Sequence, residues 1–197
     1  MGALTLGLIA ALCWGVHDTL VRYISQRVGV FQSLFPVLVS GCVATGGLAL
    51  VLGSGGLESG AGLFAAASGI VFGLTGLVFY RALAIGPVRV VAPVVAAFPI
   101  LSVGWAVVNG QVVSSLQWIA VLIVVGGCAF VAATSKDGDG AGAQPAAILW
   151  SILAAFGFAV SFALGQLSVE GGAEMSAIAL ARIGAVAIVA IVALILR

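Results

Sequence analysis

The sequence predicts an all-α membrane protein with seven transmembrane helices, and its composition is the first observation that indicates this class. Hydrophobic residues make up 63% of the 197 residues, and charged residues only 7%. A soluble domain carries about 25% charged residues, so this chain cannot cover a water-facing surface. Glycine is abundant, with 28 residues, as expected where small side chains let membrane helices approach closely. The net charge of +1 gives no reason to expect a nucleic-acid partner.

Seven apolar runs have the length of a membrane-spanning helix, which is about 20 residues. The connectors between them are short and mostly contain residues that favour turns, such as Gly86-Pro87 and Asn109-Gly110. The first run lacks the positive flank and the small-residue cleavage motif of a signal peptide, so we expect it to be retained. The predicted spans cover residues 3–22, 32–52, 62–80, 87–108, 114–134, 146–168 and 176–196.

The fourth and fifth spans are predicted to form a helical hairpin, because only residues 108–115 separate two runs of bilayer length. Pro93 and Pro99 lie inside the fourth span. Proline removes a backbone donor and bends a helix, so in lipid the freed carbonyl groups need other partners. We therefore expect a kinked fourth helix beside a cavity or beside helices that provide such partners.

The longest connector divides the chain into two parts. Residues 135–145 are polar and rich in glycine, which is typical of a flexible linker. A shift of 144 residues places residues 10–16 over 154–160, and the same shift places the span after Phe31 over the span after Met175. Both parts therefore begin with a similar pair of helices. The predicted organisation is a first repeat of five spans over residues 1–134, the linker, and the start of a second repeat over residues 146–197.

The odd number of spans in the first repeat determines how the second repeat lies in the membrane. After five spans the chain has reached the opposite side, so the second copy crosses the membrane in the opposite direction. This is the inverted-repeat architecture of secondary transporters. A complete second copy needs about three further spans. The sequence is therefore expected to be a fragment of a ten-helix bundle built from two inverted five-helix repeats.

Motifs in and around the hairpin are specific enough to compare with known families. They are the segment 80–87 with the sequence Tyr-Arg-Ala-Leu-Ala-Ile-Gly-Pro, Pro99 in the fourth span, the turn at residues 109–111, the Gln-Trp pair and the glycines of residues 116–127, and Trp14-Gly15 in the first span. Together they resemble the EamA repeat of the drug/metabolite transporter superfamily. The resemblance implies ten helices in two inverted repeats, transport of small metabolites and no cofactor.

Two positions depart from the family pattern. Gln111 stands where the family usually has glutamate, which removes a charge from the turn. Leu38 stands where the second helix of the family often has arginine, whereas Arg182 keeps an arginine at the matching position of the second repeat.

Ionisable residues inside membrane spans are costly, so they are the first candidates for a site. In the first span Trp14 and Asp18 share a helix face, as do Asp18 and Arg22, whereas His17 lies about 100° away from Asp18 around the helix. One interpretation is a site at a central cavity, where Asp18 or His17 exchanges a proton and Trp14 forms an apolar or cation–π wall. The other is an Asp18–Arg22 ion pair near the membrane boundary, with His17 at the interface.

Arg182 lies about two turns into the seventh predicted span. An unpaired arginine there costs about 2.5 kcal/mol or more. It is predicted to bind an anionic group of a substrate or to pair with Glu170, Glu174 or Asp18. Snorkelling to the membrane interface is the alternative.

Gln166 and Tyr80 complete the candidate substrate or proton site. The repeat aligns Gln166 with Arg22, and a hydrogen bond between helices also explains it. An aromatic belt at the membrane interface also explains Tyr80, and it is the expected place for Trp105 and Trp118.

The positive residues are one-sided along the chain. The connectors after odd-numbered spans and the final end hold Arg22, Arg27, Arg81, Arg89, Lys136 and Arg197. The positive-inside rule then places the N-terminus outside the cytoplasm. The family resemblance implies an N-terminus inside, so both orientations stay open.

The residues and the resemblance predict a multi-pass inner-membrane transporter. It would move a small metabolite or drug-like molecule, such as an amino acid or an amine, by alternating access, with protons as the candidate coupling ion. The alternative is a non-transporting scaffold or channel.

A retinal photoreceptor is disfavoured because the one lysine, Lys136, lies in a connector. An enzyme is not expected, because the sequence shows no nucleophile–base set, metal-ligand cluster or phosphate loop. The lipid bilayer is the expected partner, and a homodimer stays open.

Overall fold

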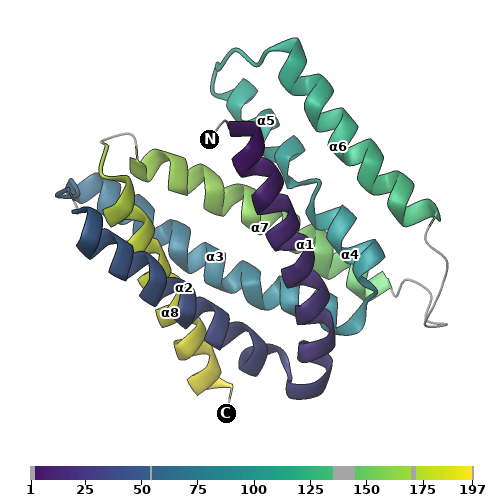
Figure 1. The fold of residues 1–197 in the computed structure, drawn as a ribbon, viewed down its shortest axis with the longest axis horizontal. Helices are drawn as coiled ribbons and strands as arrows, with labels where there is room; N and C mark the ends of the chain where they lie inside the picture. Colours follow the sequence, from purple (N-terminus) through teal and green to yellow (C-terminus); the bar gives the residue numbers. More distant parts are fainter. Residues whose placement is uncertain (1–2, 54, 135–144, 170–171, 197) are drawn as a thin grey trace.

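The protein is described by a computed structural model, which covers residues 3–53, 55–134, 145–169 and 172–196 and has only helices as regular structure there. Residues 135–144 of the predicted linker lie outside the described residues, as do Glu170 and Arg197. The helices in Figure 1 are α1 (Ala3–Val28), α2 (Val30–Leu52), α3 (Ser59–Ile85), α4 (Val88–Val95), α5 (Phe98–Val108), α6 (Ser115–Thr134), α7 (Pro145–Val169) and α8 (Glu174–Ile195).

Five segments of the described chain are long and apolar enough to cross a membrane: α2, α3, α7, α8, and α4 together with α5. Two of the seven predicted spans, α1 and α6, are not among these five segments when only the described residues are counted. α1 carries Asp18, Arg22 and Arg27, and α6 is described there as a shorter apolar helix over Ser115–Val131. The expected all-helical membrane fold is confirmed, with a smaller number of clear spans.

Two helices extend further than the sequence predicts. α1 continues to Val28 rather than to residue 22, because residues 23–28 contain no glycine or proline and the first glycine after them is Gly29, where φ is 91°. α3 continues to Ile85 rather than to residue 80 and ends where Gly86-Pro87 begins. The polar residues of the first predicted span therefore lie in the middle of a helix and not near its end.

The fourth predicted span is broken between its two prolines. α4 ends at Val95 and α5 begins at Phe98, so Pro93 lies inside α4 and Pro99 lies in the first turn of α5. Between them, the Ala97 N–H donates to the Val94 carbonyl at 3.3 Å, which closes a tighter turn than that of an α-helix. The bend therefore lies where proline interrupts the helical hydrogen-bond pattern.

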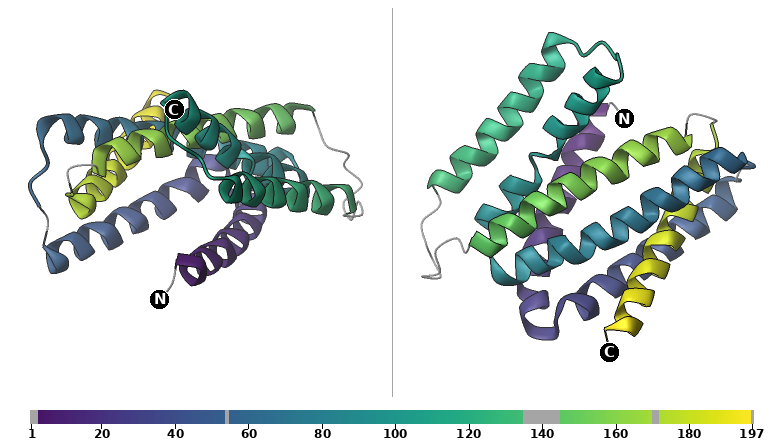
Figure 2. Two further views of the ribbon diagram at one scale, coloured as in Figure 1. Left: turned by 90° about the horizontal axis from the view of Figure 1, so that it is seen from above. Right: turned by 180° about the vertical axis from the view of Figure 1, so that it is seen from behind.

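α3 is the central helix, and it packs most extensively against α7 and α8 (Figures 1 and 2). Glycines make these contacts close. A Cβ atom added to Gly69 of α3 would collide with the carbonyl of Ala181 in α8, and one added to Gly157 of α7 would collide with Thr75 of α3. Small residues are what let membrane helices approach to such distances.

Two buried serines connect α3 to α7 through the backbone. Ser68 Oγ donates to the Ser161 carbonyl at 2.8 Å, and Ser161 Oγ donates to the Ser68 carbonyl at 3.0 Å. Both side chains are almost fully buried. Their hydroxyl groups are therefore satisfied without water, as a membrane interior requires.

α2 and α8 pack against each other and run in opposite directions (Figure 1). α8 begins at Glu174, which is 144 residues after the first residue of α2, Val30. This is the shift at which the sequence repeat appears. The second helices of the two predicted repeats therefore lie antiparallel in direct contact.

α1 is packed less closely than α2 and α3, its neighbours in the chain. Figure 2 shows its N-terminal half standing away from the other helices, and its apolar side chains are exposed there, with Leu8 at 60% and Leu12 at 73%. Its second half contacts α2, α3 and α4.

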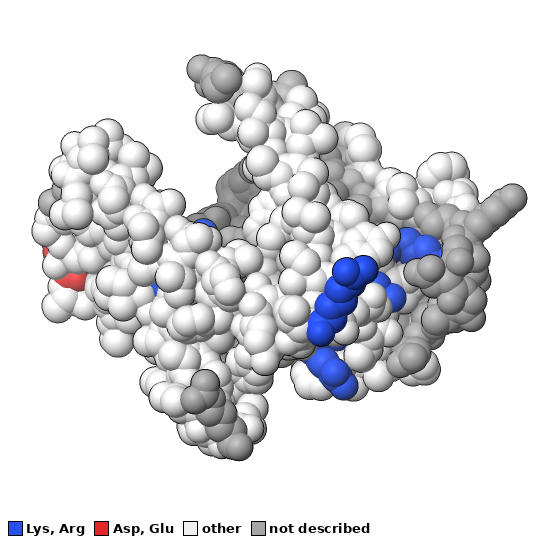
Figure 3. Space-filling model, turned by 60° about the horizontal axis from the view of Figure 1, so that its bottom comes forward, with Lys and Arg blue, Asp and Glu red and all other residues white. Residues whose placement is uncertain are grey.

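Apart from Asp18 and Arg182, the described charged residues lie toward the two ends of the bundle, and Figure 3 shows the main groups of each sign apart. The α1–α2 and α3–α4 connections lie at one end, where four described arginines occur: Arg22, Arg27, Arg81 and Arg89. Glu58 and Glu174 lie at the other end, where α2 meets α3 and α7 meets α8. The one-sided charge along the sequence is therefore also one-sided in space.

Candidate functional site

The site is built around Phe158 of α7, whose side chain is 5% exposed. Its ring contacts five other aromatic rings at centroid distances of 5.7–6.5 Å. Such pairs contribute about 0.5–1.5 kcal/mol each beyond the burial of their area. The aromatic cluster therefore ties α1, α3, α5 and α7 together, and its other members are Trp14, Phe72, Phe79, Phe98 and Phe162.

Three adjoining cavities surround the aromatic cluster. The large cavity, of about 620 Å³, lies between α3, α5, α7 and α8 and includes Ser102 and Gln166. The middle cavity, of about 360 Å³, lies between α1, α2, α3 and α8 and includes His17 and Gly41. The small cavity, of about 250 Å³, lies between α1, α4 and α7 and includes Asp18.

Side chains shared between the cavities separate them. Phe72 and Arg182 border both the large and the middle cavity, and Trp14 borders both the middle and the small one. Phe98 and Phe162 border the large and the small cavity. The three cavities therefore adjoin one another through these shared side chains.

His17 joins α1 to α3 through a chain of hydrogen bonds. Its Nδ1 lies 2.9 Å from Asp18 Oδ1, and its Nε2 lies 2.9 Å from the Tyr80 hydroxyl. In a neutral ring Nδ1–H donates to the carboxylate and Nε2 accepts from the phenol; a protonated ring donates from both nitrogens. Because Asp18 borders the small cavity while His17 and Tyr80 border the middle one, the chain connects two cavities.

The predicted Asp18–Arg22 ion pair is wrong. Arg22 Nη1 instead donates to the carbonyls of Leu83 at 2.7 Å and Ala84 at 3.1 Å. These carbonyls lie at the C-terminal end of α3, where free acceptors and the helix dipole favour a cation. Asp18 is left to pair with His17, at a side-chain exposure of 15%.

The alternative of an aromatic belt for Tyr80 is also wrong. Its side chain is 2% exposed and bonded to His17, because α3 continues beyond Tyr80 and keeps it inside the bundle. Trp105 and Trp118, by contrast, are exposed, at 57% and 38%.

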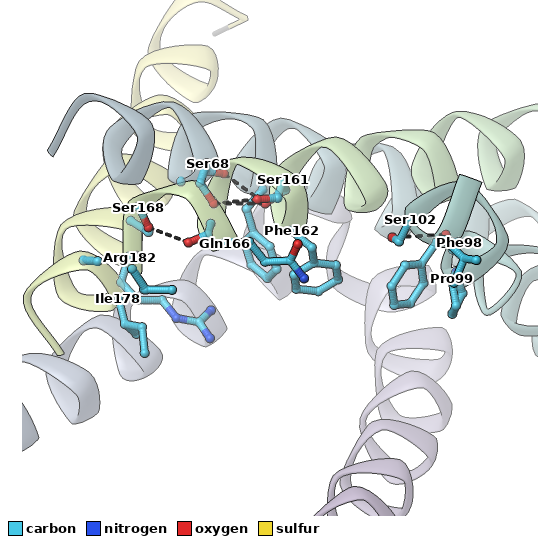
Figure 4. Close-up of a pocket in the computed structure, with 17 residues that line it drawn as sticks. Ser68, Phe98, Pro99, Ser102, Ser161, Phe162, Gln166, Ser168, Ile178 and Arg182 are labelled. Atoms are coloured by element: carbon cyan, nitrogen blue, oxygen red, sulfur yellow. Dashed lines mark hydrogen bonds between the residues drawn. The ribbon is translucent and has the colours of Figure 1, made fainter. Parts of the chain in front are cut away.

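Arg182 enters the site from α8. Its guanidinium carbon lies 5.1 Å from the centre of the Phe72 ring, a cation–π contact. Figure 4 shows its side chain extending into the same space as Phe162 and Gln166 of α7. Among the described residues it has no ion pair with Glu174 or Asp18. Glu170, the third predicted partner, lies outside the described residues.

Seven of the eight residues singled out in the sequence border these cavities. All six candidate ligand or proton residues border a cavity: Trp14, His17, Asp18, Tyr80, Gln166 and Arg182. Of the two prolines, Pro99 borders the large cavity, whereas Pro93 borders none of the three. Sequence reasoning missed Phe158 as the centre, although the repeat places it at the position of Trp14.

The comparisons with known proteins give one match. The sequence model of the EamA-like transporter family matches residues 1–133. This segment contains α1 to α5 and all but the last residue of α6, which is the predicted first repeat. Neither the curated proteins nor the solved structures contain a match to the chain.

Proposed function

The chain belongs to the EamA-like transporter family, and we propose that it moves a small metabolite or drug-like molecule across the inner membrane by alternating access. One observation supports this most directly. Polar side chains from α1, α3, α7 and α8 converge on adjoining cavities inside a bundle of apolar helices. Ionisable residues inside a membrane protein mark substrate or ion pathways, because they are too costly to keep otherwise.

The proposed architecture is a bundle of two inverted five-helix repeats, of which α7 and α8 begin the second. The antiparallel contact between α2 and α8, at the 144-residue shift of the repeat, supports it. In this architecture substrate sites lie at the interface of the repeats, near the middle of the bilayer. The cavities of the site are bordered by helices from both parts of the chain.

The break between α4 and α5 is proposed to act as a hinge for opening and closing the site. Phe98 and Pro99 at the start of α5 border the large cavity, and Ala96 in the break borders the small one. Discontinuous helices are a recurrent feature of transporter sites. A change of angle at Ala96–Ala97 would move the cavity wall directly.

The hydrogen-bonded chain of Asp18, His17 and Tyr80 is proposed to carry the coupling proton. Histidine is the side chain that changes charge nearest to neutral pH. A proton taken up by His17 from the middle cavity would be stabilised by the neighbouring carboxylate, and its release would leave the neutral ring. Loading and release of this proton can then accompany the change of access.

The test is transport by the full-length protein in liposomes. With a pH gradient imposed, a panel of labelled amino acids, amines and related compounds should include one that accumulates. His17→Gln should abolish the dependence of accumulation on the gradient. Thr19→Ala is the matched control, since Thr19 is exposed on the same helix and bonds only its own backbone. Accumulation of no compound, or accumulation that His17→Gln leaves gradient-dependent, contradicts the proposal.

The orientation of the bundle can be decided separately. A reporter fused into residues 135–145 lies outside the cytoplasm if five preceding spans start from an inside N-terminus. A cytoplasmic reporter would instead agree with the positive residues at the α1–α2 end facing inward.

A further inference from the structure

We infer that the transported molecule is a small organic monoanion with an aromatic or other apolar body, and that Arg182 binds its anionic group. The inference rests on the proposed transport function and names the substrate class of the same site. A carboxylate is the simplest anion of this kind. Three features of the cavities lead to it: the charge of Arg182, the state of Asp18, and the aromatic wall between them.

Arg182 is a cation without a counter-ion in the described part of the chain. Its one charge-related contact there is with the face of Phe72 at 5.1 Å, and neither Asp18 nor Glu174 reaches it. Arginine stays charged at any relevant pH, so it cannot escape the cost of its position by losing a proton. A bound anion is the partner that would satisfy the fork of N–H donors.

Among the described residues, Asp18 is the one carboxylate that borders the cavities, and His17 contacts it at 2.9 Å. The other titratable or charged groups that border them there are His17, Tyr80, Arg182 and the Cys13 thiol, and Asp18, His17 and Tyr80 are hydrogen-bonded together. A cationic amine would have to share Asp18 with His17. An anion meets a guanidinium group that has no ion pair among the described residues, so the charges favour anions over amines.

The repeat indicates that the transported molecule carries a single negative charge. Leu38 of α2 occupies the position that matches Arg182 of α8, and it borders the middle cavity as a buried apolar side chain. The antiparallel pair of helices therefore brings one cation to the cavities rather than two. One guanidinium group fits one carboxylate in a two-bond arrangement and leaves a dianion half paired.

The aromatic wall indicates the rest of the molecule. The large cavity is bordered by Phe72, Phe98 and Phe162 and has a volume of about 620 Å³, within the range of about 300–1,000 Å³ for small-molecule sites. The ring faces of such a wall favour a flat apolar body. Gln166 and Ser102 border the same cavity and can bond a hydroxyl or amino substituent.

The effect of the charge can be distinguished from that of the apolar body with three compounds of similar shape, which are an anion, a neutral amide and a cation: 3-phenylpropanoate, 3-phenylpropanamide and 3-phenylpropylamine. We would measure the flux of each into liposomes that hold the full-length protein, and the binding of each from the rise in melting temperature in detergent. The anion should be transported and should bind about tenfold or more tightly than the neutral amide, since it alone pairs with the guanidinium group. The amine should bind no better than the amide.

Arg182→Gln should remove the preference for the anion, with a loss of about tenfold or more in anion affinity and little change for the amide. Arg22→Gln is the matched control, because Arg22 bonds carbonyls at the end of α3 and borders none of the three cavities. If Arg182→Gln does not purify as a folded protein, Arg182→Lys keeps the charge but loses the two-bond fork, so it should weaken anion binding while leaving amide binding unchanged, and an unchanged anion affinity would overturn the inference.

The outcomes distinguish this inference from the transport function itself. Transport that prefers the amine or the amide, or an anion affinity unchanged in Arg182→Gln, overturns the inference and leaves the transporter intact. Arg182-dependent binding of the anion without flux of any compound supports the anion site and contradicts transport. Absence of both binding and flux for all three compounds overturns the inference.

Discussion

α1 and α7 occupy matching positions in the proposed repeat, yet they are packed in opposite ways. α7 packs extensively against α3, and its buried residues include the small side chains of Ser151, Ala154 and Ser161. α1 keeps most of its apolar side chains exposed and contacts the bundle chiefly through its second half. The polar chain of the site, Asp18 and His17, belongs to α1, the loosely packed helix.

The difference shows where this bundle can hold ionisable groups. Close backbone approach between α3 and α7 leaves room only for glycine, alanine and serine, whose hydroxyls are satisfied by nearby carbonyls. Where α1 packs less extensively against the bundle, a histidine and a carboxylate fit beside a cavity. The α3–α7 contact therefore works as the scaffold, and the α1 side carries the proposed chemistry.

The largest effect is expected when a glycine of α7 and a glycine of α1 are each replaced by leucine. Gly157→Leu should lower the free energy of unfolding by about 3 kcal/mol, because the new side chain collides with Thr75 at a contact that cannot widen. Gly15→Leu should change it by less than about 0.5 kcal/mol, since nothing lies within 4 Å of the position. Both are measured as the loss of monodisperse protein after heating in detergent. Equal effects would contradict the scaffold role of α7.

The next largest effect is expected from the buried serines. Ser161→Ala removes the hydroxyl that donates to the Ser68 carbonyl and should cost about 1–2 kcal/mol. Thr19→Ala on α1 removes an exposed hydroxyl that bonds the Gly15 carbonyl of its own helix, and it should cost less than about 0.5 kcal/mol. The same melting measurement compares them. A Thr19→Ala cost as large as that of Ser161→Ala would show that α1 is as tightly held as α7.

A smaller effect is expected at the contact between α1 and α3. Tyr80→Phe removes the hydroxyl bonded to His17 and should cost about 1 kcal/mol of stability. Tyr23→Phe is the control, as Tyr23 is 63% exposed, and it should change stability by less than about 0.5 kcal/mol. In liposomes only Tyr80→Phe should also weaken the response of transport to a pH gradient. If transport by Tyr80→Phe depended on the pH gradient as in the unchanged protein, the Tyr80 hydroxyl would have no part in the proton path.

The smallest effect is expected at the end of α3. Arg22→Gln removes a cation from the C-terminal carbonyls of this helix and should cost about 0.5–1 kcal/mol. Arg27→Gln, in the last turn of α1, should cost less than about 0.5 kcal/mol. A larger cost for Arg27→Gln than for Arg22→Gln would mean that the capping of α3 does not hold α1 in place.

The sequence predicted the class of the fold, because composition and the length of apolar runs depend on the bilayer and not on the tertiary contacts. It also indicated the two prolines between which α4 and α5 separate. It did not predict the partners of the polar side chains. Arg22 bonds the end of α3 and not Asp18, because α1 extends a full turn and more beyond the predicted end. Partners on other helices depend on where α1 crosses α3, which no local pattern specifies.

The aromatic centre of the site was equally hard to recognise. Phenylalanine is common in membrane spans, so Phe158 carries no signal by itself. Its alignment with Trp14 through the repeat was the one available sign, and the two rings are in contact at 6.4 Å. Repeat-related positions thus meet at the centre of the bundle, where a pair of inverted repeats would place their shared site.

The most direct measurement of alternating access labels one cysteine in the large cavity from each side of the membrane. Ser102→Cys would be introduced after Cys13, Cys42 and Cys128 are replaced, and a membrane-impermeant maleimide applied to inside-out and right-side-out vesicles. Labelling should be possible from both sides, with the favoured side exchanged when the pH gradient is reversed. Labelling from one side alone under every gradient would contradict the account.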